Sequence, residues 1–196
     1  MTTTEEFDTA VLHSLRLKGR ASTSSIAAAI GADEEIAAAV LEANAAKGLV
    51  LLRSGRISGW LLTPEGRTNI GERISIEKST VDLAVMGALY DDEFLKLNGK
   101  FKELCTHWQL AGGKAEVVET ELTTIHEANL ILLERFGASA PRFTKYVARF
   151  VSAYDRFRGG EAAALLQPMR ESYHDVWLEL HEDLLILLDR QREEDD

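Results

Sequence analysis

Residues 47–66 have the sequence KGLVLLRSGRISGWLLTPEG, in which two short apolar runs flank a polar segment. The runs Leu49–Leu52 and Ile57–Leu62 are rich in strand-forming side chains, and the serine and glycine between them are typical of a tight turn. After the second run, Thr63 and Pro64 supply a cap and a first-turn proline, which predict a helix from Pro64 to about Lys78. This segment therefore predicts a β-hairpin followed by a helix.

Upstream of the hairpin, apolar side chains recur at helical spacing in three blocks separated by glycines. The blocks end at Gly19, Gly31 and Gly48, with Ser22 or Thr23 expected to cap the second helix and Asp33 the third. The positions expected to face inward are Phe7, Val11, Leu12, Leu15, Leu17, Ile26, Ile30, Ile36, Val40 and Leu41. The short connection before Asp33 suits a helix-turn-helix.

Three helices followed by a hairpin resemble the winged helix-turn-helix domain. The segments KGLV (47–50) and LTPEG (62–66), which lie at the boundaries of the predicted helices and hairpin, resemble the corresponding segments of MarR- and PadR-type regulators. The resemblance covers about the first 75 residues. It implies that the third helix enters the major groove of DNA and that the hairpin, or wing, reaches the adjoining backbone or minor groove.

The expected recognition helix conflicts with this implication. Base edges are recognised by side chains such as Arg, Lys, Asn, Gln, Ser and Thr. In MarR-like proteins such residues usually stand at the positions held here by Glu35, Ala38 and Ala39. The whole leading surface is expected to consist of carboxylates and methyl groups, namely Asp33, Glu34, Glu35, Ala37, Ala38 and Ala39.

Contacts with the phosphate backbone are then the expected source of DNA affinity, because such contacts supply most of the sequence-independent affinity for DNA. The candidates lie at the end of the first helix, at the start of the second, on the wing and just after it. They are Arg16, Lys18, Arg20, Thr23, Ser24, Arg53, Arg56 and Arg67.

The charge divides the chain into two expected domains, residues 1–78 and 79–196. The 196 residues carry 32 acidic and 22 basic side chains, a net charge of −10. Residues 1–78 hold 10 acidic and 9 basic groups, so nine of the ten excess negative charges belong to residues 79–196. The overall acidity therefore says little about whether the first domain binds nucleic acid.

Four long amphipathic segments follow, which predict an antiparallel helical bundle. They span Val81–Leu110, with a restart at Asp91, then Ala115–Phe136, a helix starting at Pro141, and Glu161–Arg190, which Pro168 is expected to kink or split. Their expected inward positions are Val81, Val85, Leu89, Phe94, Leu97, Phe101, Leu104, Trp108, Val118, Leu122, Ile125, Leu132, Phe136, Phe143, Tyr146, Val147, Phe150, Tyr154, Leu165, Met169, Tyr173, Val176, Leu180, Leu184 and Leu187. The fold class is thus mainly α with a small β-hairpin wing, and the bundle is expected to form a homodimer.

Two helical segments of the bundle mix aromatic and polar side chains more closely than ordinary amphipathic helices do. The alternatives are simple packing of two aromatic helices and a cavity for a small organic effector. The effector-pocket candidates are Asn98, Trp108, Gln109, Tyr173, Trp177 and His181.

The sequence provides no pattern for catalysis, for a metal or for a cofactor. Glu171 and His174 form one Glu-x-x-His element, whereas a di-iron bundle needs two together with further glutamates. Cys105 lies two residues from His107, a spacing that directs them to different helix faces, and it is expected to be a small buried side chain. As the chain's single cysteine it permits no internal disulfide, which favours a reducing compartment.

The leading hypothesis is a DNA-binding transcriptional regulator that binds double-stranded DNA and is not an enzyme. The alternative is a winged helix that serves as a protein-interaction or accessory module. Residues 55–67 also look like tails attached to some phosphoenolpyruvate-utilising enzymes, which favours that alternative. The polar N-terminus and the absence of a long apolar run predict a cytoplasmic protein without a membrane segment.

Overall fold

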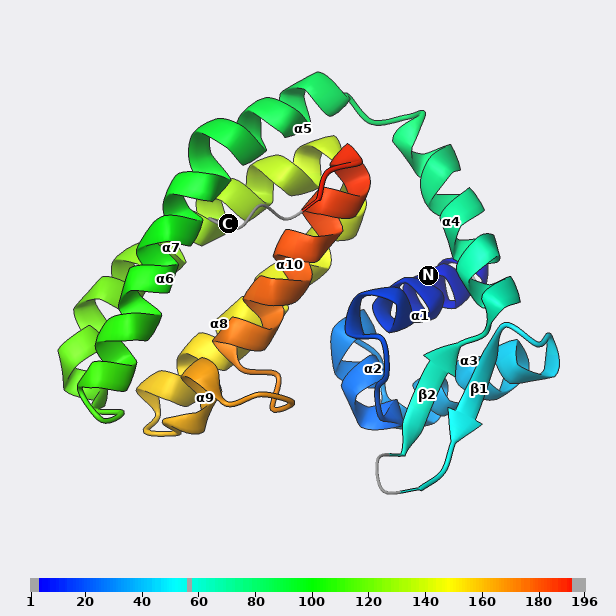
Figure 1. Cartoon of the computed structure of the whole chain (residues 1–196), viewed down its shortest axis with the longest axis horizontal. Coiled ribbons are helices and arrows are strands. Elements are labelled where there is room, and N and C mark those ends of the chain that lie inside the picture. The colour runs from blue at the N-terminus through cyan, green and yellow to red at the C-terminus, as the bar shows by residue number, and fades with distance from the viewer. Residues whose placement is uncertain (1–3, 56–57, 192–196) are drawn as a thin grey trace. The chain divides into compact units, whose positions relative to one another are not determined.

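The computed structural model describes residues 4–55 and 58–191, and its contacts divide the chain into two units with the boundary between Thr80 and Val81. The protein is mainly α-helical, with one small antiparallel hairpin (Figure 1). In the first unit the elements are α1 (Thr4–Lys18), α2 (Thr23–Ile30), α3 (Glu34–Ala46), β1 (Val50–Arg53), β2 (Gly59–Leu62) and α4 (Pro64–Lys78). The three predicted helices, the hairpin and the following helix are all present.

Local chemistry explains where α2 begins and ends. The Ser22 hydroxyl accepts a hydrogen bond from the backbone N–H of Ser25, 3.1 Å away, as an N-cap does. Gly31 ends the helix in the left-handed conformation (φ 65°), which glycine adopts without steric cost. The chain can therefore turn into α3 within three residues.

The hairpin is tied to the segment that joins α1 to α2. Its register pairs Val50 with Leu62 and Arg53 with Gly59. Ala21 forms an additional antiparallel bridge to Trp60, and the Trp60 indole N–H donates to the Thr23 hydroxyl at 3.1 Å. Strand β2 is thus held on both sides.

The start of α4 is packed tightly against the base of the hairpin. Thr63 caps the helix by accepting from the Gly66 N–H at 3.0 Å, and its hydroxyl donates to the Gly48 carbonyl at 2.7 Å. A Cβ at Gly66 would lie 1.9 Å from the Leu49 carbonyl oxygen. Only glycine fits at this position.

A polar contact sets the rotation of α3 about its axis. The Asn44 amide donates to the buried Asp8 carboxylate at 3.0 Å, and Lys47 pairs with the same carboxylate at 2.6 Å. With Asn44 inside, Ala37 and Leu41 are also buried. The prediction that Ile36 faces inward is wrong, since this side chain is 43% exposed.

The second unit contains the remaining helices. They are α5 (Leu83–Leu89), α6 (Leu95–Leu110), α7 (Ala115–Ser139), α8 (Lys145–Arg158), α9 (Ala163–Leu166) and α10 (Tyr173–Leu188). A π-helical turn at Tyr90–Phe94 joins α5 to α6, and a 3-10 turn at Pro141–Thr144 precedes α8. Helix α6 packs on α7, α7 on α8, and α8 on α10.

The predicted restart at Asp91 does not occur, because the π-helical turn carries the helix through this point without a break. The extra residue in the π-helical turn keeps the side chains before it on the same helix face as buried Phe94. Met86 and Tyr90 therefore face the core. The expectation that Val85 faces inward is wrong for this reason, and Val85 is 45% exposed.

Pro168 separates α9 from α10, as a proline inside a helical pattern is expected to do. Met169 consequently lies in a connection with positive φ and is 88% exposed, which corrects its assignment to an apolar helix face. The next helix begins with a capping box, in which Ser172 accepts from the Asp175 N–H and Asp175 accepts from the Ser172 N–H.

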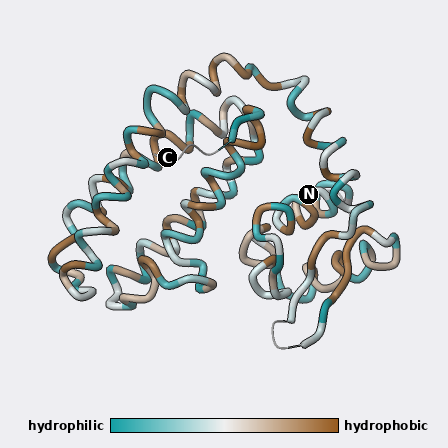
Figure 2. Tube along the Cα trace, in the orientation of Figure 1, coloured by the Kyte–Doolittle hydropathy of each residue, from teal (hydrophilic) through white to brown (hydrophobic). Residues whose placement is uncertain are grey.

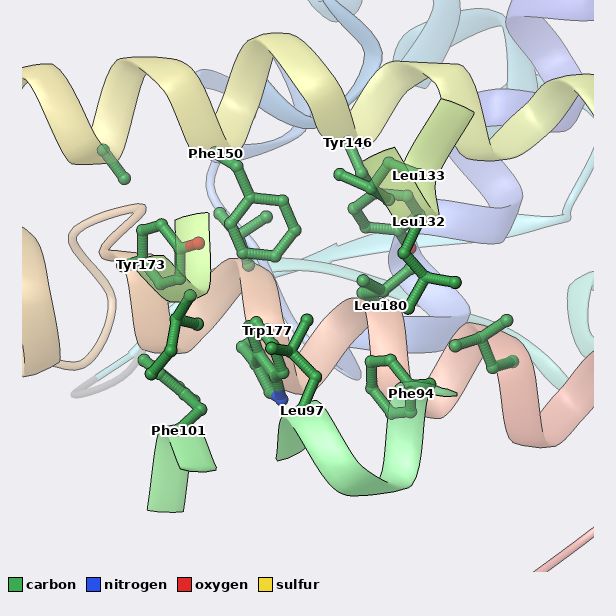
Figure 3. Packing of buried hydrophobic residues seen from close by; sticks show 14 of the residues in the cluster. Phe94, Leu97, Phe101, Leu132, Leu133, Tyr146, Phe150, Tyr173, Trp177 and Leu180 are labelled. Atoms are coloured by element: carbon green, nitrogen blue, oxygen red, sulfur yellow. The ribbon is translucent and has the colours of Figure 1, made fainter. Parts of the chain in front are cut away.

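The core of the second unit is a continuous cluster of large apolar side chains from α5 to α10. Figure 3 shows Phe94, Phe101, Phe150, Tyr173 and Trp177 packed between these helices. Along each helix, hydrophobic and hydrophilic residues alternate at short intervals (Figure 2), as burial of one face requires. Among the described residues, no helix is long and apolar enough to cross a membrane.

Candidate functional site

The solvent-facing surface of α3 is acidic and apolar. Glu34, Glu35, Ala39 and Glu42 are exposed together with Ile36. The expectation that Ala37 belongs to this surface is wrong, because Asn44 and Leu41 lie on the same helix face as Ala37 and turn it inward, where it is fully buried. The described face therefore offers carboxylates and methyl groups to a partner, and few groups that hydrogen-bond base edges.

Three of the predicted phosphate contacts lie beside the start of β2, where the chain leaves the tip of the hairpin, and a fourth is adjacent to them in sequence. Arg53 is exposed and pairs in register with Gly59, and the Arg20 side chain lies against Gly59, with its Cγ 2.9 Å from where a Cβ would stand. Thr23 is tied to the next residue of β2, Trp60. Ser24 follows in the first turn of α2. We call Arg20, Thr23, Ser24 and Arg53 the tip cluster.

The other candidates lie elsewhere or outside the described residues. Arg16 extends toward the middle of α4, where its Nη1 is 3.7 Å from a Cβ built at Gly71. Arg67 is exposed in the first turn of α4, at the base of the hairpin rather than at its tip. Lys18 stands in the last turn of α1. Arg56 is not among the described residues.

Five of the six effector-pocket candidates lie in the packed interior of the second unit. The Trp177 indole N–H donates to the Asn98 side-chain oxygen at 2.9 Å, and the Trp177 ring stacks on Phe101 with centroids 4.5 Å apart. Tyr173 is fully buried beside them (Figure 3). His181 is within 2.8 Å of the Tyr90 hydroxyl through its Nε2. These contacts are those of a filled, hydrogen-bonded interior.

The other two candidates, Trp108 and Gln109, lie near the end of α6 and differ in burial. Trp108 packs edge-on against Phe157, with ring centroids 5.5 Å apart, while Gln109 is exposed. The effector pocket therefore stays a prediction.

The structure contains a buried cluster of charges that the sequence analysis did not identify. We call it the ion cluster, and it joins α8 and the preceding turn to α10 and to Glu171 in the connection before α10. Asp183, which is fully buried, pairs with Arg142 at 2.8 Å and accepts from the Tyr146 hydroxyl at 2.9 Å. The ion cluster consists of Arg142, Lys145, Arg149, Glu171, Glu179 and Asp183.

The ion cluster balances three cations against three carboxylates in a desolvated setting. Arg149 makes a bidentate contact with Glu179 at 2.9 and 3.0 Å and also pairs with Glu171 at 2.6 Å. Burial lowers the pKa of Lys145, whereas burial and the neighbouring Asp183 raise the pKa of Tyr146 well above its usual value. In the sequence, the positive residues 142, 145 and 149 recur at helical spacing, but exposed charges show the same spacing, so this pattern alone does not reveal the cluster.

The histidines and acidic residues of the described part of the chain form no group of three or more that could hold a metal ion. His174 and His181 share α10, but His181 is engaged with Tyr90 instead.

Cys105 is half-buried, and burial raises the pKa of its thiol to about 12. Because the thiolate is the reactive form, we expect iodoacetamide at pH 8 to alkylate the native protein at least about tenfold more slowly than the urea-unfolded chain. Mass spectrometry of quenched samples measures both rates. Equal alkylation rates would contradict the burial of the Cys105 thiol. A faster rate in the native protein would indicate an activated nucleophile.

Comparison with known protein families, characterised proteins and solved structures finds no match to this chain.

Proposed function

We propose that the first unit is a winged helix that binds double-stranded DNA through the phosphate backbone, and that the chain acts as a transcriptional regulator. The tip cluster carries this proposal, since it combines two arginines with hydroxyls in the first turn of α2. Arginine binds phosphate in a bidentate manner, and a helix N-terminus favours anions. Three helices followed by a bridged hairpin are also the arrangement expected of a winged helix.

The surface of α3 limits how such binding can select sequence. Its carboxylates would meet the phosphate potential unfavourably, and its alanines contact little beyond a thymine methyl. We therefore propose a binder with low discrimination between sequences. Dimerisation through the second unit would give the assembly two tip clusters, and light scattering of the purified protein tests for the dimer.

The test is fluorescence anisotropy with a mixed-sequence DNA duplex over a salt series. The two arginines of the tip cluster predict a logarithmic salt slope of about −1.8 and a loss of roughly 12-fold in affinity between 50 and 200 mM salt. The double variant Arg20→Ala/Arg53→Ala should reduce the magnitude of the slope by about 2. Arg67→Ala removes the same type of charge at the base of the hairpin and should leave the affinity nearly unchanged.

The absence of binding at 50 mM salt would contradict the proposal. So would an equal loss in the double variant and in Arg67→Ala, since this result would indicate a general effect of charge rather than contacts at the tip cluster.

The exposed face of α3 favours a second candidate, a protein-interaction or accessory module. Ile36 and Ala39 are flanked there by Glu34, Glu35 and Glu42, a combination suited to a protein surface with basic and apolar residues. The resemblance of residues 55–67 to tails of phosphoenolpyruvate-utilising enzymes supports the same candidate. If the Ile36→Ser variant keeps its affinity for DNA, the exposed face of α3 is not part of the surface that binds DNA.

A further inference from the structure

A second group of polar side chains lies inside the second unit, apart from the ion cluster. Thr123, His126 and Asn129 follow one another at three-residue spacing on α7, so they share a helix face. Opposite them are Tyr154 of α8 and Tyr173 of α10. His126 is stacked on Tyr154 with ring centroids 4.0 Å apart, and its Nδ1 lies 3.3 Å from the Tyr173 hydroxyl.

Asn129 is the unusual member of this group. It is fully buried, yet neither its side-chain nitrogen nor its side-chain oxygen makes a hydrogen bond of good geometry with the described residues, although the Tyr173 hydroxyl is near enough to interact with the amide. The amide stands beside the Tyr173 hydroxyl and acts to lower the pKa of that group, although burial raises it overall. A buried amide without partners is costly, and native proteins satisfy nearly all such groups.

The side chains near Asn129 determine which kind of molecule can form hydrogen bonds with its amide. Burial lowers the pKa of His126 against the opposing effect of Asp155 and Glu127, and burial keeps Tyr173 protonated. Thr123 and Tyr154 already contact each other, with their hydroxyl oxygens 2.9 Å apart. The Tyr173 hydroxyl beside Asn129 is therefore neutral, and Asn129 itself offers one acceptor and two donor hydrogens.

From these contacts we infer that the second unit binds a small neutral molecule at Asn129, one that both donates and accepts hydrogen bonds and also reaches the Tyr173 hydroxyl. Water is the smallest such molecule, and a buried water commonly makes about three bonds of this kind. A small organic ligand with a hydroxyl or amide edge presents the same chemistry.

The experiment replaces Asn129 by Leu, which has nearly the same volume and no polar atoms, in the full-length chain. If a bound molecule satisfies the amide, the variant loses those bonds and its Tm falls by about 2–6 °C. If the amide has no partner, leucine removes a buried unsatisfied group and the Tm rises. Asn98→Leu provides the matched control, because it removes an amide whose oxygen is bonded to Trp177, and its Tm should fall.

A second measurement on the unmodified protein does not depend on the variant's folding. A high-resolution crystal structure should show density within hydrogen-bond distance of both Asn129 amide atoms. Compact density identifies water, whereas extended density with extra mass in native mass spectrometry identifies an organic ligand, and both support the inference. No density at either atom, or a more stable Asn129→Leu variant, overturns it.

Discussion

Replacing Asp183 by Asn should destabilise the second unit by about 3–5 kcal/mol, the cost of breaking a buried ion pair by removing one charge. Asp183 is fully buried and compensates Arg142 at 2.8 Å and Lys145 at 3.7 Å. The asparagine has nearly the same shape, so the loss comes from uncompensated positive charge and not from a cavity. Urea unfolding followed by circular dichroism measures the change.

An exposed ion pair in the same unit supplies the control. Arg156 and Glu161 approach to 3.3 Å but both remain substantially exposed to solvent. Glu161→Gln should therefore change the stability by less than about 1 kcal/mol. A loss of that small size for Asp183→Asn would contradict the interpretation that the ion cluster is desolvated.

Replacing Gly66 by Ala should destabilise the first unit by about 2–4 kcal/mol. The added methyl carbon would lie 1.9 Å from the Leu49 carbonyl oxygen and 3.2 Å from the Leu62 side chain, so α4 must move off the hairpin. This is overpacking against backbone, which cannot give way as a flexible side chain can. Thermal unfolding with circular dichroism reports the loss.

Gly71, five residues further along α4, gives a matched substitution in the same helix. A Cβ there meets only Arg16 Nη1 at 3.7 Å, an ordinary contact. Gly71→Ala should therefore stabilise the protein by about 0.5–1 kcal/mol through higher helix propensity. If both alanine variants behaved alike, the close approach of α4 to the hairpin would not be the cause.

The sequence predicted the elements of the first unit because local signals decide them. Thr63 and Pro64 mark the start of α4, and the glycines mark the helix ends. The inward face of α3 was misassigned because apolar periodicity alone favoured Ile36. What decides that face is the long-range contact from Asn44 to Asp8, 36 residues earlier, which no local pattern reveals.

The candidate sites show the same division between local and distant information. The residues of the tip cluster could be named from the sequence because they lie close to the hairpin or to α2, and their role in binding stays a prediction. Grouping them needed the bridge between Ala21 and Trp60. The ion cluster joins Arg142 to Asp183 across 41 residues, and buried charges on an otherwise apolar helix face resemble exposed ones when only spacing is considered.

The π-helical turn at Tyr90–Phe94 bears on how relatives of this chain should be aligned. A π turn accommodates one extra residue while the helix on each side keeps its orientation, so Met86 and Phe101 still face one core. A related protein that lacks one residue between Leu89 and Leu95 would form an uninterrupted α-helix with both halves of the core unchanged. Alignments of such sequences should therefore allow a single-residue gap inside this helix, where gaps are normally penalised most.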